Sequence, residues 1–245
     1  MNRREALRTG AVALGLPLLH TSREEEGEKK LKVVVVGAHP DDPESGCGGT
    51  AALYSDLGHK VILLYVTRGE AGIPETSHDE AARIRTLEAE MACKILGAEP
   101  RFAGQIDGAT EVTARRYEEF RKILAAEHPD LVFSHWPIDS HRDHRAASLL
   151  VFDAWLALER SFPLYYYEVM SGTQTSCFSP THYVNISPSQ SLKREACFAH
   201  RSQKPDEFYP DHDAMNRFRG MEYGCRFAEA FVRHNQDQPA TGALL

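Results

Sequence analysis

One short segment of the chain places a histidine beside two carboxylates. His39 is followed, after a proline, by Asp41 and Asp42. Imidazole nitrogen and carboxylate oxygen are both ligands of zinc, and a second carboxylate next to them can accept a proton from water. We therefore expect His39 and Asp42 to bind a divalent metal ion and Asp41 to act as a general base.

A second segment repeats this chemistry. His141 and His144 stand three residues apart, and Asp143 lies between them. Residues three apart are neighbours on a helix, so both imidazoles can face one cleft if a helix begins here. A hydrolytic zinc site needs three protein ligands and one open position, and His144 is the expected third ligand. His141 would then stabilise an oxyanion or protonate a leaving amine. Asp143 would either orient an imidazole or meet the helix dipole.

Both segments follow predicted strands. Four valines at 33–36 precede His39, and an apolar run over 131–136 precedes the second segment. Helical sequence at 50–57, closed by a glycine, separates the first strand from another apolar run at 61–67, which makes a parallel strand–helix–strand unit. The carboxyl ends of parallel strands meet at one edge of a sheet, so the two segments should share one site.

The rest of the chain continues this alternation and predicts a doubly wound α/β domain with a mostly parallel sheet. Further helices are expected at 79–96, 112–127, 141–156 and 215–234, and further strands at 102–106, 164–170 and 181–186. The glycine-rich stretch 46–49 is expected to form a turn. It does not fit a dinucleotide-binding loop, because such a loop directly follows a strand, whereas the seven residues from His39 to Ser45 intervene here.

The composition is that of one soluble globular domain. Of 245 residues, 42% are hydrophobic and 26% are charged, and the formal net charge of -7 argues against nucleic acid as a partner. The five cysteines are scattered and never form a C-x-x-C pair. We therefore expect buried free thiols rather than disulfides or a structural zinc knuckle.

Residues 1–30 differ from the single domain expected over 31–245. Arg3 and Arg4 precede an apolar stretch at 10–19, and this arrangement resembles a twin-arginine export signal. The stretch is about half as long as a bilayer-spanning helix, so no stable membrane span is expected. A charged linker follows it. The expected location is the periplasm or another extracytoplasmic compartment; without export the protein would be cytoplasmic.

Together, the two segments match the motifs of a known family. Residues 38–44 read Ala-His-Pro-Asp-Asp-Pro-Glu and residues 141–144 read His-Arg-Asp-His, which resembles the A-H-P-D-D-x-E and H-x-D-H motifs of the PIG-L/LmbE-like deacetylases. The sequences at 85–89 and 200–203 are similar to two further family segments. The resemblance implies a Rossmann-like three-layer sandwich and one Zn²⁺ per chain, which another divalent metal could replace. It also implies hydrolysis of an N-acetyl group from an N-acetylglucosaminyl-type substrate, with release of acetate and a free amine.

The family roles carry over to individual positions. They give the same metal ligands, base and acid that the spacing indicates. They add three residues expected to bind substrate: Arg85, Glu44 and His200. The implied partner is a small N-acetylated sugar or glycoconjugate, and a homo-oligomer is compatible with the sequence.

Two other functions remain open from the sequence. A metal-dependent esterase or phosphoesterase could use the same site, and two metal ions about 3.5–4 Å apart would favour it. A carbohydrate-binding protein could keep the fold without turnover, although the intact Asp41 argues against that.

Overall fold

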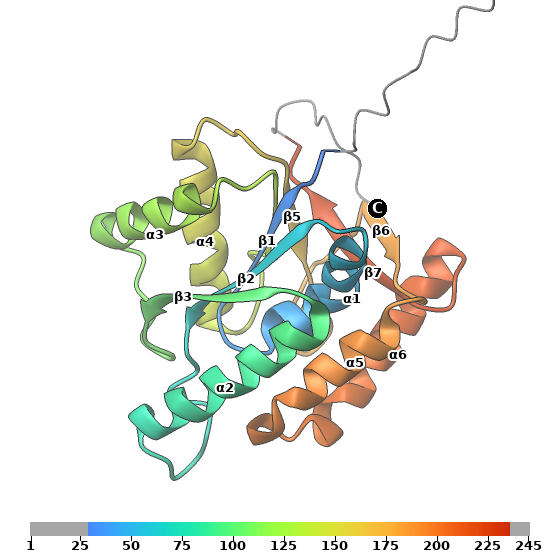
Figure 1. The fold of residues 1–245 in the computed structure, drawn as a ribbon, viewed down its shortest axis with the longest axis horizontal. Helices are drawn as coiled ribbons and strands as arrows, with labels where there is room; N and C mark the ends of the chain where they lie inside the picture. Colours follow the sequence, from blue (N-terminus) through green and yellow to red (C-terminus); the bar gives the residue numbers. More distant parts are fainter. Residues whose placement is uncertain (1–28, 236–245) are drawn as a thin grey trace, which may run out of the picture.

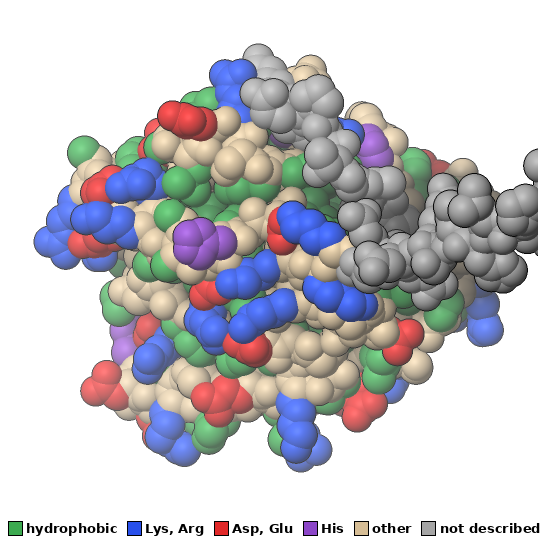
Figure 2. All heavy atoms as spheres, turned by 45° about the horizontal axis from the view of Figure 1, so that its top comes forward, with side chains coloured by type: hydrophobic (Ala, Val, Ile, Leu, Met, Phe, Trp, Pro, Cys, Tyr) green, Lys and Arg blue, Asp and Glu red, His purple; other side chains and the backbone are tan. Residues whose placement is uncertain are grey.

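The computed structural model describes residues 29–235 (Figure 1). The predicted export signal lies outside these residues. Within them, no helix is both long enough and apolar enough to cross a membrane. On the face shown in Figure 2, basic and acidic side chains are interspersed, and the basic ones form no unbroken surface.

A seven-stranded sheet runs through the described chain in the order β3-β2-β1-β4-β5-β7-β6. Its strands are β1 (Lys32–Gly37), β2 (Lys60–Thr67), β3 (Glu99–Gln105), β4 (Leu131–His135), β5 (Leu164–Tyr167), β6 (His182–Asn185) and β7 (Ala228–Arg233). The strands from β3 to β5 in this order are parallel, whereas β7 runs antiparallel to both of its neighbours. The chain leaves β1 toward β2 on one side and later returns to β4 on the other. This is the switch point at which open α/β sheets bind ligands.

Six helices of the described chain cover the two faces of the sheet. They are α1 (Asp42–Asp56), α2 (His78–Leu96), α3 (Ala114–Glu127), α4 (Arg142–Ala157), α5 (Gln190–Ala199) and α6 (Pro205–Tyr223). Helix α3 packs against α4, whereas α5 packs against α1, α2 and α6. Figure 1 shows these two groups on opposite sides of the sheet. The predicted three-layer α/β sandwich with a mostly parallel sheet is confirmed.

The valine run of β1 shows why this strand is central. Val33 and Val35 enter the core beneath α1, α2 and α5, and Val34 and Val36 enter the core beneath α3 and α4. All four are completely buried. A strand buried on both faces needs apolar side chains at every position, which an unbroken β-branched run provides.

The prediction of a last helix over 215–234 is wrong. Helix α6 ends where Gly224 adopts φ 87°, a left-handed conformation that glycine takes readily. Strand β7 follows, and its first four residues are buried. Glu229 lies within this buried strand. The Glu229 carboxylate accepts a hydrogen bond from Lys193 Nζ at 2.6 Å. The negative charge that β7 buries is therefore compensated by Lys193.

The expected turn at 46–49 is also wrong, because these glycines belong to α1. A Cβ at Gly46 would overlap the ring of Tyr167 in β5, and a Cβ at Gly49 would overlap Ile186. The glycines therefore let α1 approach the sheet closely. Helix α1 begins at Asp42, directly after the predicted base Asp41.

Candidate active site and metal centre

A cavity of about 620 Å³ opens at the carboxyl ends of β1 and β4. The loop after β1 and the first turn of α1 form one part of its wall, and the start of α4 forms another. Six residues predicted for the site line it: His39, Asp41, Asp42, Arg85, His141 and His144. The sheet thus brings together the two segments that the sequence assigns to one site.

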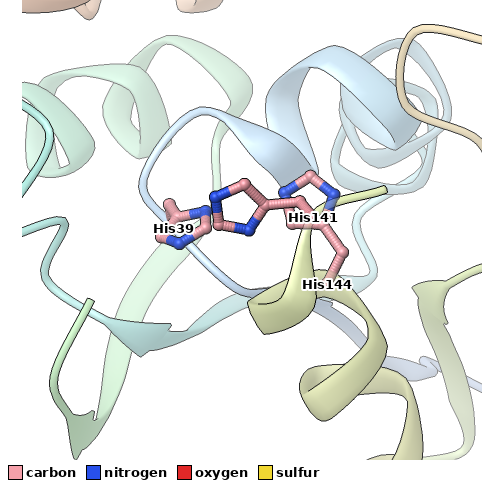
Figure 3. Close-up of side chains that lie close together, drawn as sticks. All are labelled: His39, His141 and His144. Atoms are coloured by element: carbon pink, nitrogen blue, oxygen red, sulfur yellow. The ribbon is translucent and has the colours of Figure 1, made fainter. Parts of the chain in front are cut away.

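The three predicted metal ligands contact one another through Asp42. Its Oδ2 lies 3.2 Å from His39 Nδ1, and its Oδ1 lies 3.2 Å from His144 Nε2. Figure 3 shows the histidines converging from the loop after β1 and the start of α4. Two ligands that are each about 2.0–2.1 Å from a tetrahedral zinc ion lie about 3.3–3.4 Å apart. The observed spacing fits ligands that share such an ion.

The far nitrogen of each ring contacts a further carboxylate. His39 Nε2 lies 3.1 Å from Asp107 Oδ1 and 3.3 Å from Asp143 Oδ2. His144 Nδ1 lies 3.2 Å from Asp139 Oδ1. Carboxylates in this position hold metal-binding histidines in the correct tautomer and orientation. His39, Asp42 and His144 would hold the ion, and the carboxylates behind the two rings would keep the imidazoles in place.

The charges of this cluster depend on one another. Burial alone would lower the pKa of His39 and His144, but hydrogen bonds to the surrounding carboxylates raise the pKa of His39 well above its usual value. Asp42 and Asp139 raise the pKa of His144 to about 9. Burial alone would raise the pKa of Asp42, but His144 and His135 hold it well below its usual range. The arrangement favours positive charge at its centre, which a divalent cation can supply.

Three sets of side chains in the described chain offer ligand atoms within 4.8 Å of one another. These sets are His39, His141 and His144; Asp42, His135 and His144; and His39, Asp107 and Asp143. His135 is a poor ligand, because the Ala38 N–H donates to its Nε2 at 3.0 Å and occupies that lone pair. His141 has a buried Nδ1 without a hydrogen-bond partner among the described residues. The predicted trio of His39, Asp42 and His144 is not itself one of these sets, although each member belongs to at least one of them. The buried His/Asp cluster as a whole can hold a metal ion.

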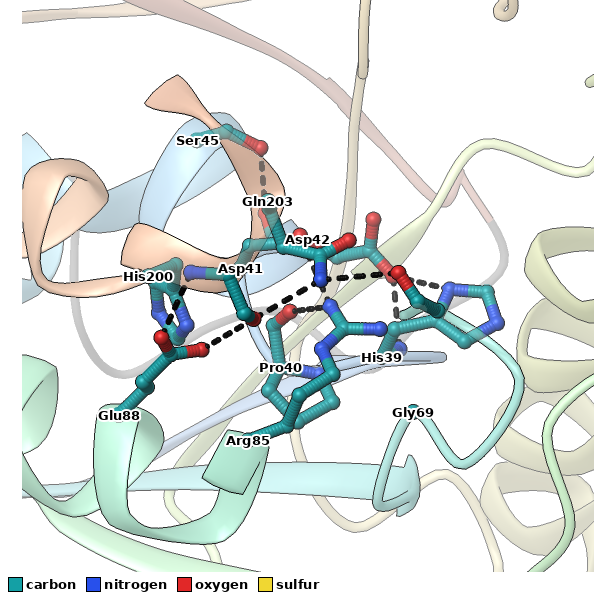
Figure 4. Close-up of polar contacts among 12 residues, drawn as sticks. His39, Pro40, Asp41, Asp42, Ser45, Gly69, Arg85, Glu88, His200 and Gln203 are labelled. Carbon is teal, nitrogen blue, oxygen red and sulfur yellow. Dashed lines mark hydrogen bonds and ion pairs between the residues drawn. The ribbon is translucent and has the colours of Figure 1, made fainter. Parts of the chain in front are cut away.

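Asp41 lies at the N-terminal end of α1 with φ 111°, a conformation that residues other than glycine rarely adopt. Strain of this kind is concentrated at functional sites. Arg85 Nη2 donates to Asp41 Oδ2 at 2.9 Å and also to the carbonyl oxygen of Pro40 (Figure 4). Burial raises the pKa of Asp41 to about 6 against the opposing effect of Arg85. A carboxylate in this range can take up and release a proton near neutrality.

Arg85 reaches the site from α2 and lines the cavity, although its side chain is only 3% exposed. Gly69 and Gly72, in the loop after β2, make room for it, because a Cβ at either position would overlap the guanidinium group. The loop therefore holds Arg85 against Asp41. Its predicted contact with substrate is compatible with its place in the cavity wall.

Asp143 and His141 occupy different positions. Asp143 contacts His39 and accepts the Gly108 N–H at 2.7 Å, and it does not line the cavity. Of the two roles left open by the sequence, the structure shows the contact with an imidazole. The His141 ring lies on the cavity, with its centroid 4.7 Å from those of His39 and His144.

Glu44 and His200 lie beneath the cavity and do not line it. Both are completely buried, and His200 Nε2 lies 2.9 Å from Glu44 Oε1. Tyr65 Oη donates to the same oxygen at 2.6 Å, and the Asp41 N–H donates to Glu44 Oε2 at 3.2 Å. This placement corrects the expectation that they touch substrate, because their polar atoms are turned toward each other and toward the backbone of Asp41.

The sequence analysis does not predict one wall of the cavity, nor two carboxylates that contact the predicted metal ligands. The missed wall comes from the segment after β5 and from the region around α6: Met170, Thr173, Gln174, Gln203, Phe208 and His212. Gln203 belongs to the segment 200–203 that resembles a family segment, but no motif covers the other five residues of this wall. The two carboxylates belong to Asp107 and Asp139. Their positions shortly after predicted strands could have indicated that they lie at the site.

A family model described as PIG-L: GlcNAc-PI de-N-acetylase matches residues 34–155. The matched segment runs from β1 into α4 and contains both motifs. The chain is also similar to the diacetylchitobiose deacetylase of Thermococcus kodakarensis, with 28% identity over 218 residues that cover 81% of each chain.

Two further comparisons agree with this one. A 1D-myo-inositol 2-acetamido-2-deoxy-α-D-glucopyranoside deacetylase of Kineococcus radiotolerans is 40% identical over 88 residues, which cover 33% of this chain and 24% of that one. The structure of N,N'-diacetylchitobiose deacetylase from Pyrococcus horikoshii, in complex with its inhibitor MPG, matches with a TM-score of 0.74 and 28% identity. That match covers 83% of both chains.

Proposed function

Because the chain belongs to the PIG-L/LmbE-like family of GlcNAc deacetylases, we propose that it is a zinc-dependent hydrolase of N-acetylglucosaminyl-type substrates. It removes the acetyl group and releases acetate and a free amine. The observation that carries this proposal is the position of Asp42 between the imidazoles of His39 and His144, with Asp41 on the same cavity. Metal ligands beside a further carboxylate suit hydrolysis better than binding alone.

The residues divide the chemistry among them. His39, Asp42 and His144 would hold the zinc ion, which would supply Lewis-acid chemistry at the acetamide carbonyl and make a water more acidic. Asp41 takes a proton from the attacking water on its carboxylate. The ring N–H of His141 stabilises the carbonyl oxygen as it becomes negative, or protonates the leaving amine nitrogen.

The surrounding residues keep these groups in position. Arg85 restrains the Asp41 carboxylate through its bond to Oδ2, and Glu44 restrains the Asp41 backbone. Asp143 and Asp139 orient the two imidazoles from behind. A cavity of about 620 Å³ lies within the range of small-molecule sites and can accept a sugar unit.

Acetate release from a panel of N-acetylated sugars tests the proposal on zinc-loaded protein. Release is expected from at least one N-acetylglucosamine derivative, and it should stop when a chelator removes the metal and resume when zinc returns. Phosphate and carboxylate esters in the same panel separate this activity from that of an esterase or phosphoesterase. If no panel member yields acetate at full zinc occupancy, the deacetylase proposal is wrong.

We also propose that the protein is exported through its N-terminal segment. Arg3, Arg4 and the apolar stretch 10–19 support this proposal. Fractionation should find the wild type outside the cytoplasm and an Arg3→Lys, Arg4→Lys double variant inside it. Cytoplasmic retention of the wild type would refute export.

A further inference from the structure

A second hollow adjoins the active-site cavity along α6. We name it the α6 groove; it measures about 660 Å³ and is lined chiefly by Met170, Thr173, Asp211, Met215, Phe218 and Arg219. Met170 and Thr173 line the active-site cavity as well. The two hollows are therefore adjacent and share one short wall.

Helix α6 contributes to both hollows. Phe208 and His212 face the active-site cavity, whereas Met215 and Phe218 face the α6 groove. The two pairs follow one another along α6, so this helix lines both hollows. A ligand that extends from the cavity past Met170 would next meet Met215 and Phe218.

The α6 groove offers apolar surface without a free cation. Phe218 is 53% exposed, and Met170 and Met215 are half-buried. Arg219 is the one cation among the described residues that line the groove, and its charge is compensated. Its Nε and Nη2 donate to the two carboxylate oxygens of Glu168 at 2.6 and 2.8 Å, and its Nη1 donates to Glu222 at 2.7 Å. With Asp211 at the rim, this surface disfavours phosphate and other anions.

The wall between the two hollows is held in place. The N–H groups of Gly172 and Thr175 donate to the carbonyl oxygens of Thr175 and Val169, each at 3.1 Å. The Thr175 hydroxyl donates to Asp139 Oδ2 at 2.9 Å, and Asp139 also contacts the predicted ligand His144. The groove is thus preformed and attached to the metal centre, which favours binding because little ordering is needed.

From this adjacency and the apolar lining we propose that the α6 groove binds an uncharged apolar aglycone of the substrate. The substrate is then an N-acetylated amino sugar linked to an alkyl or aryl group, with the sugar in the cavity and the apolar group against Met215 and Phe218. This inference rests on the proposed deacetylase function, because it extends the same site.

The test compares the methyl and hexyl glycosides of N-acetylglucosamine, which differ only in alkyl length. Acetate release by the zinc-loaded wild type should show a hexyl-to-methyl ratio of kcat/KM of at least about tenfold. Phe218→Ser and Met215→Gln should each reduce this ratio at least about threefold. Met91→Gln is the matched control, since Met91 is also 53% exposed but lies on α2, away from the groove.

Each outcome decides the proposal. A wild-type ratio near one, or a ratio unchanged in both groove variants, overturns it. The same holds if Phe218→Ser dissociates a dimer while the ratio stays constant, because the apolar face would then be a contact between copies. If neither glycoside yields acetate, the proposed function fails instead. The Kd values of the two glycosides, measured by calorimetry on the wild type and both variants, then decide whether the groove binds the alkyl chain.

Discussion

Asp139 Oδ1 lies 3.2 Å from Nδ1 of His144, on the side of the ring away from Asp42. The same oxygen accepts the backbone N–H of His141 at 2.7 Å, and the other carboxylate oxygen accepts the Thr175 hydroxyl at 2.9 Å. One buried carboxylate thus fixes a predicted metal ligand, the start of α4 and the wall shared with the α6 groove.

Asp139→Ala should weaken metal binding, because His144 loses the group that orients its ring. A loss of about 10–100-fold in zinc affinity is expected. Competition with a chromophoric chelator measures it. Asp213→Ala is the matched control. It removes a carboxylate of α6 that forms an ion pair with Arg217, and this variant should bind zinc like the wild type. Equal affinities in the two variants would remove Asp139 from the metal centre.

Asp41→Asn and His39→Ala should separate chemistry from metal binding. The first change removes the base but leaves all three ligands, so bound zinc should persist while acetate release falls by about 10²–10⁴-fold. The second change removes a ligand, so zinc and activity should be lost together. Metal content by mass spectrometry and the rate on one substrate give both readouts. Full zinc occupancy in His39→Ala would show that the ligand assignment is wrong.

Two glycines of α1 should respond oppositely to alanine. Gly46→Ala places a methyl group into the ring of Tyr167 and should destabilise the fold by about 1–3 kcal/mol. At Gly48 the nearest atom to an added Cβ is 3.4 Å away, so Gly48→Ala should gain up to about 1 kcal/mol from helix propensity. Urea denaturation of both variants checks this. If Gly46→Ala is as stable as Gly48→Ala, the close contact of α1 with β5 is not a constraint.

Lys193→Met should be strongly destabilising. Lys193 and Glu229 are both buried, so the change leaves a carboxylate in the interior without its cation. The expected cost is about 3–5 kcal/mol in the free energy of unfolding. The double variant Lys193→Met, Glu229→Gln should recover part of it, since no charge remains. Lys122→Met is the exposed control and should cost less than about 1 kcal/mol.

The sequence was sufficient to predict where the candidate metal-binding residues come together, because its signals are local. The valines before His39 specify a strand buried on both faces, and the ligands occupy the residues that follow directly. The same holds for β4 and His144. A parallel sheet then brings such strand ends together regardless of the length of chain between them.

Other features depend on contacts between segments far apart in the chain. Nothing near Glu229 in the sequence reveals that Lys193 compensates its charge, so the sequence does not predict a buried strand there. The glycines at 46–49 suggest a turn from the sequence alone. In the structure Gly46 instead lets α1 pack against the ring of Tyr167, which is distant in the sequence. His200 is predicted at the substrate by its position in a motif, whereas its bond to Glu44 puts it under the cavity. Burial and pairing of this kind become visible only in three dimensions.

Glu229 also connects β7 to α1. Its two carboxylate oxygens accept the N–H groups of Gly49 and Thr50 at 2.9 and 2.8 Å, within the helix that begins at Asp42. The segment 34–155 carries both motifs, but it lacks this acceptor from β7. An isolated fragment of that length would lose this carboxylate and, with it, the connection between α1 and β7. We therefore expect the fragment that carries both motifs to be less stable than the full chain.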